Sequence, residues 1–499
     1  MKKRIAFVLA VVLVLGLCAC GGNGEGGKTE KTFDSLHVGV SRQIITADNP
    51  IGIHLPGGGD PNRLSETILD DQTLTCIAIT DKANNTVLFY SQDLQSVSPD
   101  WVREYQRLVA KATGIAAENI YMSATHTHSA AYPKDTTTQQ NIEFTIKYEK
   151  AIVEAAKAAL EDRAPATMYC SEVDVQEANG GQAMAFVRHI KHMDGSVAGA
   201  NFGTYKQAMM NGFPYEADNV AQLVKFVREG EGKKPVLMMN WGAHATFYGT
   251  TALKMYSSDY PAYIRQYIET NTDYVYAHFL SGAGDQTPNI PLYPTANHGL
   301  ECPDYGAKMG EIIADYTAVD ANFTKVEDDV IRKKSQVITV ESQKFSEHVA
   351  DLVPMANDVY QYFLENGQAE GTTYAVSKGF QSCYEARAFV NRANMPETQE
   401  IAIEVMSLGS LSLVIAPWEL AGHDGAKVIR EAVNESGLYD MAFIMAYCNG
   451  MYGYIPAKSN YEYNNNRGSY EAYACPYEKG TCEQLAQAYI DLLGELKNS

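Results

Sequence analysis

The apolar positions of the chain fall into short β-rich runs and longer stretches with helical spacing. Leu74–Thr80 and Thr86–Ser91 are two such runs separated by a polar turn, which predicts a β-hairpin. Pro99–Thr113 carries apolar residues at helical spacing, with a proline at its start and Gly114 after its end, and it predicts an amphipathic helix. A short strand is predicted next, at Asn119–Ala124.

The same alternation continues to the end of the chain. Further strands are predicted at Val236–Asn240, Tyr274–Leu280, Ile401–Ser407, Leu411–Ala416 and Met441–Tyr447, and further helices at Asn141–Leu160, Tyr260–Thr270, Tyr305–Tyr316, Ala421–Asn434 and Cys482–Leu496. Val319–Lys334 is the best candidate for an internal boundary. The chain is therefore predicted to be an α/β or α+β protein with a mixed β-sheet and flanking helices.

Several predicted strands lead directly into polar clusters. These clusters are Thr125–His128, Gly242–His244, Gly282–Asp285, Trp418–Glu419 and Asn449–Tyr454. Ligands of α/β sheets gather beyond the carboxyl ends of the strands. Five clusters in that position predict one shared cleft.

Histidines in two of the clusters suggest metal chemistry. His126 and His128 are two residues apart, so both imidazoles face the same side of an extended segment. His244 is a further candidate ligand, and the residues alone leave open whether it is a core histidine instead. Glu419 follows an apolar strand, where a carboxylate needs a cation or a metal as its partner. Catalytic zinc sites usually combine histidines with a carboxylate.

The N-terminus has the pattern of an export signal. Three basic residues at positions 2–4 precede the apolar run Ile5–Leu17, which is shorter than the ~20 residues that span a bilayer. The stretch Leu17–Cys20 resembles a bacterial lipobox, so residues 1–19 are predicted to be a lipoprotein signal peptide and Cys20 the acylated residue. An ordinary secretory signal cut nearby is the alternative. Residues 20–35 are expected to form a flexible tether, which places the protein outside the cytoplasmic membrane.

The composition narrows the classes of partner. Of the 499 residues, 45% are hydrophobic and 20% charged, which is enough to bury a sizeable core. Lys and Arg total 40 against 60 Asp and Glu, and the net charge of −20 argues against a nucleic-acid partner, which needs a basic face. The cysteines form no CxxC pair, so no thiolate zinc site is predicted, and a disulfide between Cys475 and Cys482 stays open.

The ordered motifs of the chain resemble those of the neutral (non-lysosomal) ceramidases, zinc amidases that hydrolyse the N-acyl bond of ceramide. The motifs are Val38–Ser41, Leu55–Gly59, Ser123–Ser129, Asn240–Thr246, Ser258–Pro261, Gly284–Asn289, Ala416–Glu419, Gly453–Tyr454 and Tyr470–Ala472. They run in family order over almost the whole chain after the signal.

The resemblance implies a catalytic site with one zinc ion per chain. The four implied zinc ligands are His126, His244, Glu419 and Tyr454. His128 would exchange protons with the reacting groups, and Arg188 and Tyr470 would bind the oxygen of the scissile amide. Thr287 stands where the family usually carries serine, and its hydroxyl could still contact the substrate.

The implied activity is direct hydrolysis of ceramide or a ceramide-like lipid by zinc-bound hydroxide, without an acyl-enzyme. The implied fold is a mixed-sheet catalytic domain over residues 36–499, and the C-terminal immunoglobulin-like domain of longer family members is not expected. The chain departs from the family pattern at Ser129–Pro133 and just before Gly453. These departures lie around the substrate path, so they weaken the ceramide assignment more than the zinc assignment.

Two other functions stay open. The protein could be a zinc hydrolase of another amide or ester. It could also be a non-catalytic, lipid-anchored solute-binding protein with structural histidines, because such proteins share the lipobox and the acidic charge. Zinc in the purified protein, lost on His126→Ala, would separate the enzyme from the binding protein.

Overall fold

A computed structural model describes residues 32–57, 60, 62–188, 190–191, 197–198, 217–249, 253–289, 300–343, 352–380, 382–393, 395–462 and 469–498. Phe33–Ser499 forms one compact unit. The predicted signal peptide and Cys20 lie outside the described residues and stay predictions. Within the predicted tether, the Phe33 N–H donates to the Asn84 side chain (2.7 Å). None of the helices in the described ranges is long and apolar enough to cross a membrane.

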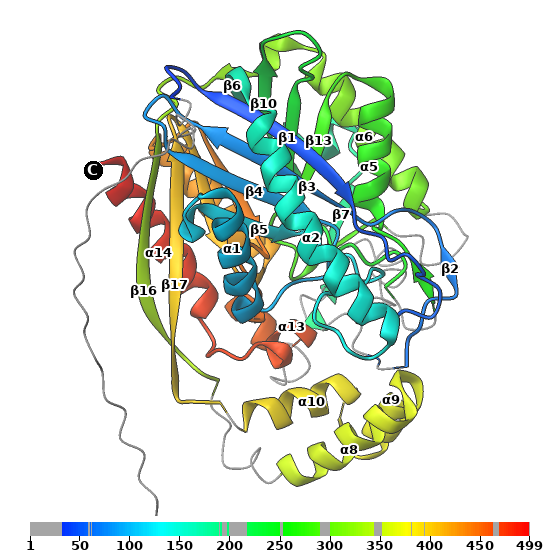
Figure 1. Cartoon of the computed structure of the whole chain (residues 1–499). Coiled ribbons are helices and arrows are strands. Elements are labelled where there is room, and N and C mark those ends of the chain that lie inside the picture. Colours follow the sequence, from blue (N-terminus) through cyan, green and yellow to red (C-terminus); the bar gives the residue numbers. More distant parts are fainter. Residues whose placement is uncertain are drawn as a thin grey trace, which may run out of the picture. The chain divides into compact units, whose positions relative to one another are not determined.

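Over the described residues, the largest element is a nine-stranded mixed sheet in the order β13-β11-β10-β6-β1-β3-β4-β5, with β15 pairing β6 (Figure 1). Its strands are β1 (His37–Ile44), β3 (Thr73–Thr80), β4 (Thr86–Gln92), β5 (Ile120–Ala124), β6 (Ala164–Asp174), β10 (Val220–Arg228), β11 (Val236–Trp241), β13 (Val275–Leu280) and β15 (Thr324–Lys325). Most neighbours are antiparallel, but β4 and β5 run parallel, as do β11 and β13.

A second, four-stranded sheet packs face to face on the first. It contains β16 (Ile331–Glu341), β17 (Thr398–Leu408), β18 (Leu411–Ala416) and β20 (Met441–Ala446), and β18 and β20 are parallel. Apolar side chains of both sheets form one buried cluster between them. Within it, the rings of Phe279 and Phe443 meet edge to face with 5.8 Å between centroids. The two inner faces are therefore held together by hydrophobic burial.

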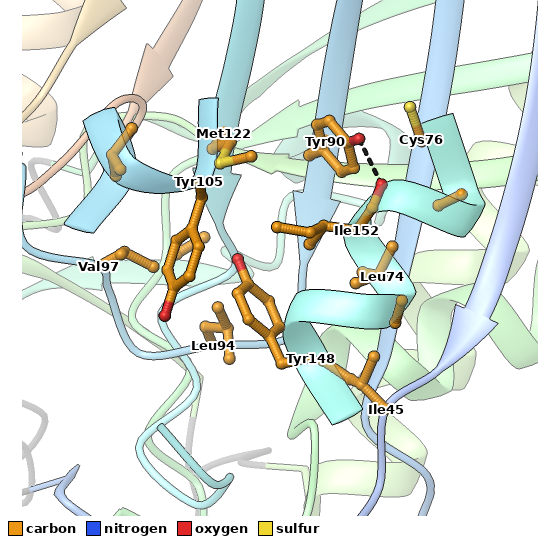
Figure 2. Packing of buried hydrophobic residues seen from close by; sticks show 14 of the residues in the cluster. Ile45, Leu74, Cys76, Tyr90, Leu94, Val97, Tyr105, Met122, Tyr148 and Ile152 are labelled. Carbon is orange, nitrogen blue, oxygen red and sulfur yellow. Dashed lines mark hydrogen bonds between the residues drawn. The ribbon is translucent and has the colours of Figure 1, made fainter. Parts of the chain in front are cut away.

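Helices cover the outer faces of both sheets. The large sheet carries α1 (Pro99–Thr113), α2 (Gln139–Glu161), α5 (Tyr260–Asn271) and α6 (Cys302–Thr317), and the small sheet carries α11 (Lys427–Ser436) and α14 (Thr481–Lys497). Figure 2 shows the cluster beneath α2, where the Tyr90 hydroxyl donates to the Ile152 carbonyl at 2.7 Å. The order of layers is helices, sheet, sheet, helices, and the predicted mixed-sheet class with flanking helices is confirmed.

The remaining elements are short or form a separate helical arm. The short ones are β2 (Thr67–Ile68), β7 (Ala185–Val187), β8 (Ile190–Lys191), β9 (Val197–Ala198), β12 (Met255–Tyr256), β14 (Gln286–Pro288), β19 (Glu419–Leu420), β21 (Tyr454–Ile455), α3 (Val175–Ala178), α13 (Tyr470–Ala474), 3₁₀ turns at Ala117–Asn119, Asp320–Asn322 and Lys458–Glu462, and a π-helical turn at Gly422–Ala426. The helical arm consists of α8 (Val353–Asn366), α9 (Gln368–Ser377) and α10 (Cys383–Arg392), which pack around a small apolar core of their own (Figure 1).

The predicted helix Pro99–Thr113 is confirmed with the same ends. The Ser98 hydroxyl accepts from the Trp101 N–H, and Gly114 ends the helix in the left-handed conformation (φ 80°). The predicted helix Ala421–Asn434 instead begins as the π-helical turn and becomes α-helical only at Lys427. The reason is a tertiary contact, because the Gly422 N–H donates to the Asp285 carboxylate at 2.7 Å.

Two further expectations are corrected by the structure. Val319–Lys334 is no domain boundary, because it carries the chain from β15 of the large sheet to β16 of the small sheet within one compact unit. Cys475 and Cys482 are both free and buried, so the disulfide left open does not form. The Cys475 thiol faces the Tyr477 carbonyl and the Cys482 thiol faces the Asp424 carbonyl.

The two sheets are also joined by hydrogen bonds. The Asn240 amide, at the end of β11, donates to the Ile444 carbonyl (2.8 Å) and accepts from the Ile444 N–H (3.1 Å). After the end of β20, the Asn449 N–H donates to the Met122 carbonyl of β5 at 2.8 Å. These bonds bring the carboxyl ends of strands from both sheets together at one place.

Replacing Asn240 by leucine should weaken this joint. The change keeps the side-chain volume but deprives the Ile444 N–H and carbonyl of their partners, and each buried unpaired group costs ~1–3 kcal/mol. We expect the free energy of unfolding, measured by urea denaturation, to fall by ~2–5 kcal/mol. Asn271→Leu, at the exposed end of α5, is the control and should change it by less than ~0.5 kcal/mol. Equal losses in the two variants would contradict this role of Asn240.

Candidate metal centre

The ends of three strands, each of which has one parallel neighbour, bring the candidate ligands together. His126 follows β5, His244 follows β11 and Glu419 follows β18. Tyr454 joins them because β19 and β21 pair in parallel with Glu419 opposite Tyr454. Residues from four of the five predicted polar clusters thus meet at one buried place, and the fifth cluster supplies the backbone around them.

The donor atoms of these side chains face one another at short distances. The Nε2 atoms of His126 and His244 are 3.1 Å apart, and Nε2 of His128 is 3.1 Å from that of His126. Glu419 Oε1 lies 2.8 Å from His126 Nε2 and 3.3 Å from His244 Nε2. The ligand atoms of the three histidines all lie within 4.8 Å of one another, so this group could hold a metal ion.

Backbone carbonyls fix which nitrogen of each ring carries the proton. His126 Nδ1 lies 2.6 Å from the Gln95 carbonyl, and His244 Nδ1 lies 2.5 Å from the Ala283 carbonyl. A carbonyl oxygen only accepts, so both Nδ1 atoms are the donors and both Nε2 atoms carry bare lone pairs in the neutral rings. Two lone pairs and a carboxylate oxygen then converge with no proton between them. This arrangement fits a cation at its centre. Histidines whose other ring nitrogen donates to a backbone carbonyl are typical of metal sites.

The protonation states agree with metal binding. Burial, helped by Arg188, lowers the pKa of His244 to about 4. Loss of water around the ring, together with His126 and His244, lowers the pKa of His128 well below its usual value. Burial disfavours the charged form of Glu419, but the facing histidines outweigh it and hold the Glu419 pKa well below its usual value. At neutral pH His244 and His128 are therefore neutral and Glu419 is ionised, as ligation requires.

Backbone conformation around the centre is unusual. His126 has a φ of 62° and Tyr447 a φ of 52°, in the left-handed region that non-glycine residues rarely adopt. The Tyr447 hydroxyl donates to Glu419 Oε1 at 3.1 Å, and its ring lies against His126 with 4.2 Å between centroids. Such conformations cost on the order of 1–3 kcal/mol each and cluster at functional sites.

Two glycines allow backbone to approach the candidate ligands closely. A Cβ on Gly57 would lie 2.0 Å from the His128 carbonyl oxygen, and one on Gly284 would lie 2.5 Å from the Glu419 carbonyl oxygen. Any other residue at either position would push His128 or Glu419 out of place.

Arg63 ties together the segments around His128. Its guanidinium is almost fully buried (1% exposed) and donates to the carbonyls of Gly57 (3.2 Å), His128 (2.5 Å) and Tyr248 (2.7 Å). It also donates to the Ser129 hydroxyl and the Leu253 carbonyl. Arg63 is a positioning residue, because its rigid planar fork holds the backbone that carries His128.

The remaining predicted residues lie beside this centre. The rings of Tyr454 and Tyr470 are 5.5 Å apart between centroids, and Arg188 lies 6.0 Å over the Tyr470 ring. Arg188 Nη2 pairs with Glu471 at 2.8 Å, with 2% and 1% of the side chains exposed, and it also donates to the Gly284 carbonyl. Burial raises the pKa of Tyr454 and of Tyr470, so both phenols keep their protons unless a cation lies close.

Thr287 carries a buried hydroxyl next to the strand that leads into Arg188. It lies on β14, paired opposite Phe186 of β7, the strand that leads into Arg188. Its hydroxyl is buried and has no hydrogen-bond partner among the described residues. A buried unpaired hydroxyl is costly, which suits a group that meets a ligand.

Sequence reasoning missed three residues of this site. Tyr447 and Arg63 gave no signal, because the positive φ of one and the carbonyl partners of the other arise only from the tertiary fold. Glu471 stands next to Tyr470 within a motif already singled out, and a buried carboxylate there needs a cation such as Arg188.

Two solved structures are similar to this chain. Neutral ceramidase from Pseudomonas aeruginosa gives a TM-score of 0.67 over 93% of this chain and 75% of that chain, at 17% sequence identity. A ceramidase complexed with C2 gives a TM-score of 0.66 with the same coverage and identity. The chain has the fold of the neutral ceramidases. No protein-family model matches it, and no curated protein does so either.

The metal centre of this ceramidase fold can be tested by metal analysis. We expect about one divalent metal ion per chain in the purified protein, lost in His126→Ala and in Glu419→Gln, because each removes a convergent donor. His37→Ala, a histidine of β1 outside the cluster, should keep the ion. A chelator should lower the melting temperature of wild type and of His37→Ala, since a bound ion stabilises only the folded state. Full metal content in both ligand variants would refute the assignment.

Proposed function

We propose that this protein is a zinc-dependent amidohydrolase that cleaves the N-acyl amide bond of ceramide or a ceramide-like lipid. The observation that carries the proposal is the convergence of donor atoms of His126, His244 and Glu419, which lie within 3.3 Å of one another. The likeness in fold to two ceramidase structures supports the amide substrate.

Zinc is the metal that this donor set favours. Two neutral imidazoles and a carboxylate are a common ligand set of catalytic zinc, and the phenol of Tyr454 is the candidate fourth ligand. Bound zinc would polarise the amide carbonyl and lower the pKa of a coordinated water from about 15.7 towards 7.

The neighbouring side chains of the chain suit the other tasks of amide hydrolysis. His128 is neutral and lies at the edge of the centre, so its ring can accept a proton and pass it to the leaving amine. Arg188 and the protonated Tyr470 are donors for an oxygen that gains charge in the transition state. Glu471 and the Gly284 carbonyl orient Arg188, and Thr287 offers a buried hydroxyl to the substrate.

The convergence of the donor atoms also bears on the two alternative functions, a solute-binding protein and a zinc hydrolase of another substrate. A solute-binding protein has no need of bare imidazole lone pairs facing a carboxylate, which destabilise the fold without a cation. A zinc hydrolase of another amide or an ester uses the same centre, and only the walls of the substrate path distinguish it from a ceramidase.

The proposal includes anchoring through Cys20 at the outer face of the cytoplasmic membrane. Two acyl chains hold a protein stably on a bilayer. We expect Cys20→Ser to move the protein from the membrane fraction to the medium or to leave it unprocessed. Mass spectrometry that finds an unmodified mature N-terminus at another residue would reject this anchor.

Tyr470→Phe tests the catalytic part of the proposal. The change removes only the hydroxyl and leaves the ring to pack on Tyr454, so zinc content and melting temperature should stay as in wild type. Loss of one oxyanion donor typically lowers kcat by roughly 10²–10³. The assay is release of fatty acid from a fluorescent N-acyl-sphingosine.

Tyr473→Phe on the same helix is the matched control, since its hydroxyl faces Ser382 at 3.3 Å. We expect its kcat within a few-fold of wild type. If Tyr470→Phe turns over as fast as Tyr473→Phe, Tyr470 has no part in the reaction. If zinc-loaded wild type cleaves other amides or esters but no N-acyl-sphingosine, the ceramide assignment is wrong.

A further inference from the structure

A cavity lies directly beside Tyr470, between the candidate site and the helical arm. Its volume is about 320 Å³, at the lower end of the ~300–1,000 Å³ typical of small-molecule sites. Tyr470 and Gly453 line it on the side of the metal centre, and Tyr384, Arg387 and Arg392 line it from α10. It is therefore continuous with the residues proposed to hold the scissile amide.

Stacked rings connect the cavity to the metal centre. Tyr454 contacts Tyr470 with 5.5 Å between ring centroids, and Tyr470 contacts Tyr384 with 6.3 Å. Arg387 then lies 5.2 Å over the Tyr384 ring. A substrate group that enters the cavity from the scissile bond passes Tyr470 first and then meets Arg387.

The two arginines of the cavity differ in their partners. Arg392 donates to the Ala472 and Tyr473 carbonyls and so attaches α10 to α13. Arg387 is partly buried and stacks on Tyr384, but it forms no ion pair with any carboxylate of the described residues. Since the chain carries 60 acidic residues against 40 basic ones, a partly buried arginine left without a carboxylate is unusual here.

The wall that carries Arg387 is held in place. The Gln368 N–H at the start of α9 donates to the Asp60 carboxylate at 3.3 Å, which docks the helical arm beside the loop that contains Gly57. The helical arm is thus attached to the body at two places, at the start of α9 and through Arg392 of α10. Arg387 therefore presents its charge to the cavity from a fixed position.

We propose that this cavity is a subsite for an anionic group on the amine half of the substrate, with Arg387 as the residue that binds it. The inference rests on the proposed amidase function and adds that, among ceramide-like N-acyl amines, those whose headgroup carries a sulfonate, carboxylate or phosphate are the preferred substrates. A guanidinium matches such oxygens with paired hydrogen bonds.

The amine half is assigned to this cavity because of the cost of burying charge. An acyl chain is hydrocarbon, and a partly buried guanidinium packed against it would lose water without gaining a partner. An anionic headgroup instead replaces the lost water with charge-assisted hydrogen bonds. The acyl chain must therefore leave the scissile bond in another direction.

Three substrates with the same acyl chain and the same spacer test the subsite. They are N-dodecanoyl-taurine (sulfonate), N-dodecanoyl-ethanolamine (neutral) and N-dodecanoyl-ethylenediamine (ammonium), assayed with the full chain in a non-ionic detergent. We expect wild type to give the highest kcat/KM on the taurine amide. Arg387→Gln should lower the ratio of taurine to ethanolamine kcat/KM by about 10–100-fold, the range that one hydrogen bond to a charged group supplies. Arg387→Glu should prefer the ammonium substrate.

Lys378→Gln is the matched control. Lys378 lies on the same helical arm and stacks on Tyr374 at 5.0 Å, in the same way as Arg387 on Tyr384, but it is exposed and does not line the cavity. Its substrate ratio should equal that of wild type. If Arg387→Gln keeps the wild-type ratio of taurine to ethanolamine kcat/KM, the subsite is overturned. A loss of kcat/KM of the same size on all three substrates would also overturn it, because that result means that Arg387 acts through Tyr470.

Binding separates a failure of the subsite from a failure of the proposed function. If wild type hydrolyses none of the three amides, the amidase proposal fails for these lipids, and calorimetry of the same compounds still tests the cavity. Tighter binding of the taurine amide than of the ethanolamine amide, lost in Arg387→Gln, supports the subsite. Equal binding of both compounds to wild type contradicts it.

Discussion

Two bonds from imidazole Nδ1 to backbone carbonyl determine the chemistry of this molecule. The Gln95 and Ala283 carbonyls accept hydrogen bonds from Nδ1–H of His126 and His244, so the unprotonated Nε2 of each neutral ring faces Glu419. The two carbonyls belong to the segments that follow β4 and β13, while the histidines follow the neighbouring strands β5 and β11. Each ring is thus oriented by the parallel partner of its own strand, and Glu419 arrives from the other sheet. The centre can form only where both sheets are in register and in contact.

Such a centre destabilises the fold that carries it. Converging lone pairs, two positive φ values and the buried Arg63, which has no hydrogen bond to a carboxylate of the described residues, all oppose folding at one place. The surrounding contacts offset this cost, since Asn240 joins the sheets and Arg63 satisfies its five N–H groups on three separate segments. A bound cation would remove the largest remaining penalty, which is why metal and stability are expected to be linked.

The sequence predicted those parts of this arrangement that depend on residues close together in the chain. The spacing of apolar residues predicts the hairpin β3–β4, and together with the capping residues it predicts helix α1. The polar clusters that follow apolar strands predict where the site lies. The sequence alone could not decide whether His244 is a ligand or a core histidine, because that depends on Ala283 and Glu419, which are distant in the chain. Nor does it indicate which sheet each strand joins, since strands such as β3 of the large sheet and β18 of the small sheet are both buried along their whole length. The helical arm was missed because α8–α10 bury only a small core, so few of their positions are apolar and buried.

The candidate chemistry and the candidate selectivity reside on different parts of the molecule. The candidate metal donors stand at strand ends inside the double-sheet core, where a shift of one residue would separate them. Arg387 stands on an arm with its own core, which is joined to the rest by contacts such as those of Asp60 and Arg392. Side chains of α10 can therefore change without disturbing His126, His244 or Glu419. A fold shared with ceramidases at 17% identity is compatible with a different headgroup for this reason, because the core that holds the donors constrains the reaction while the arm alone constrains what enters beside Tyr470.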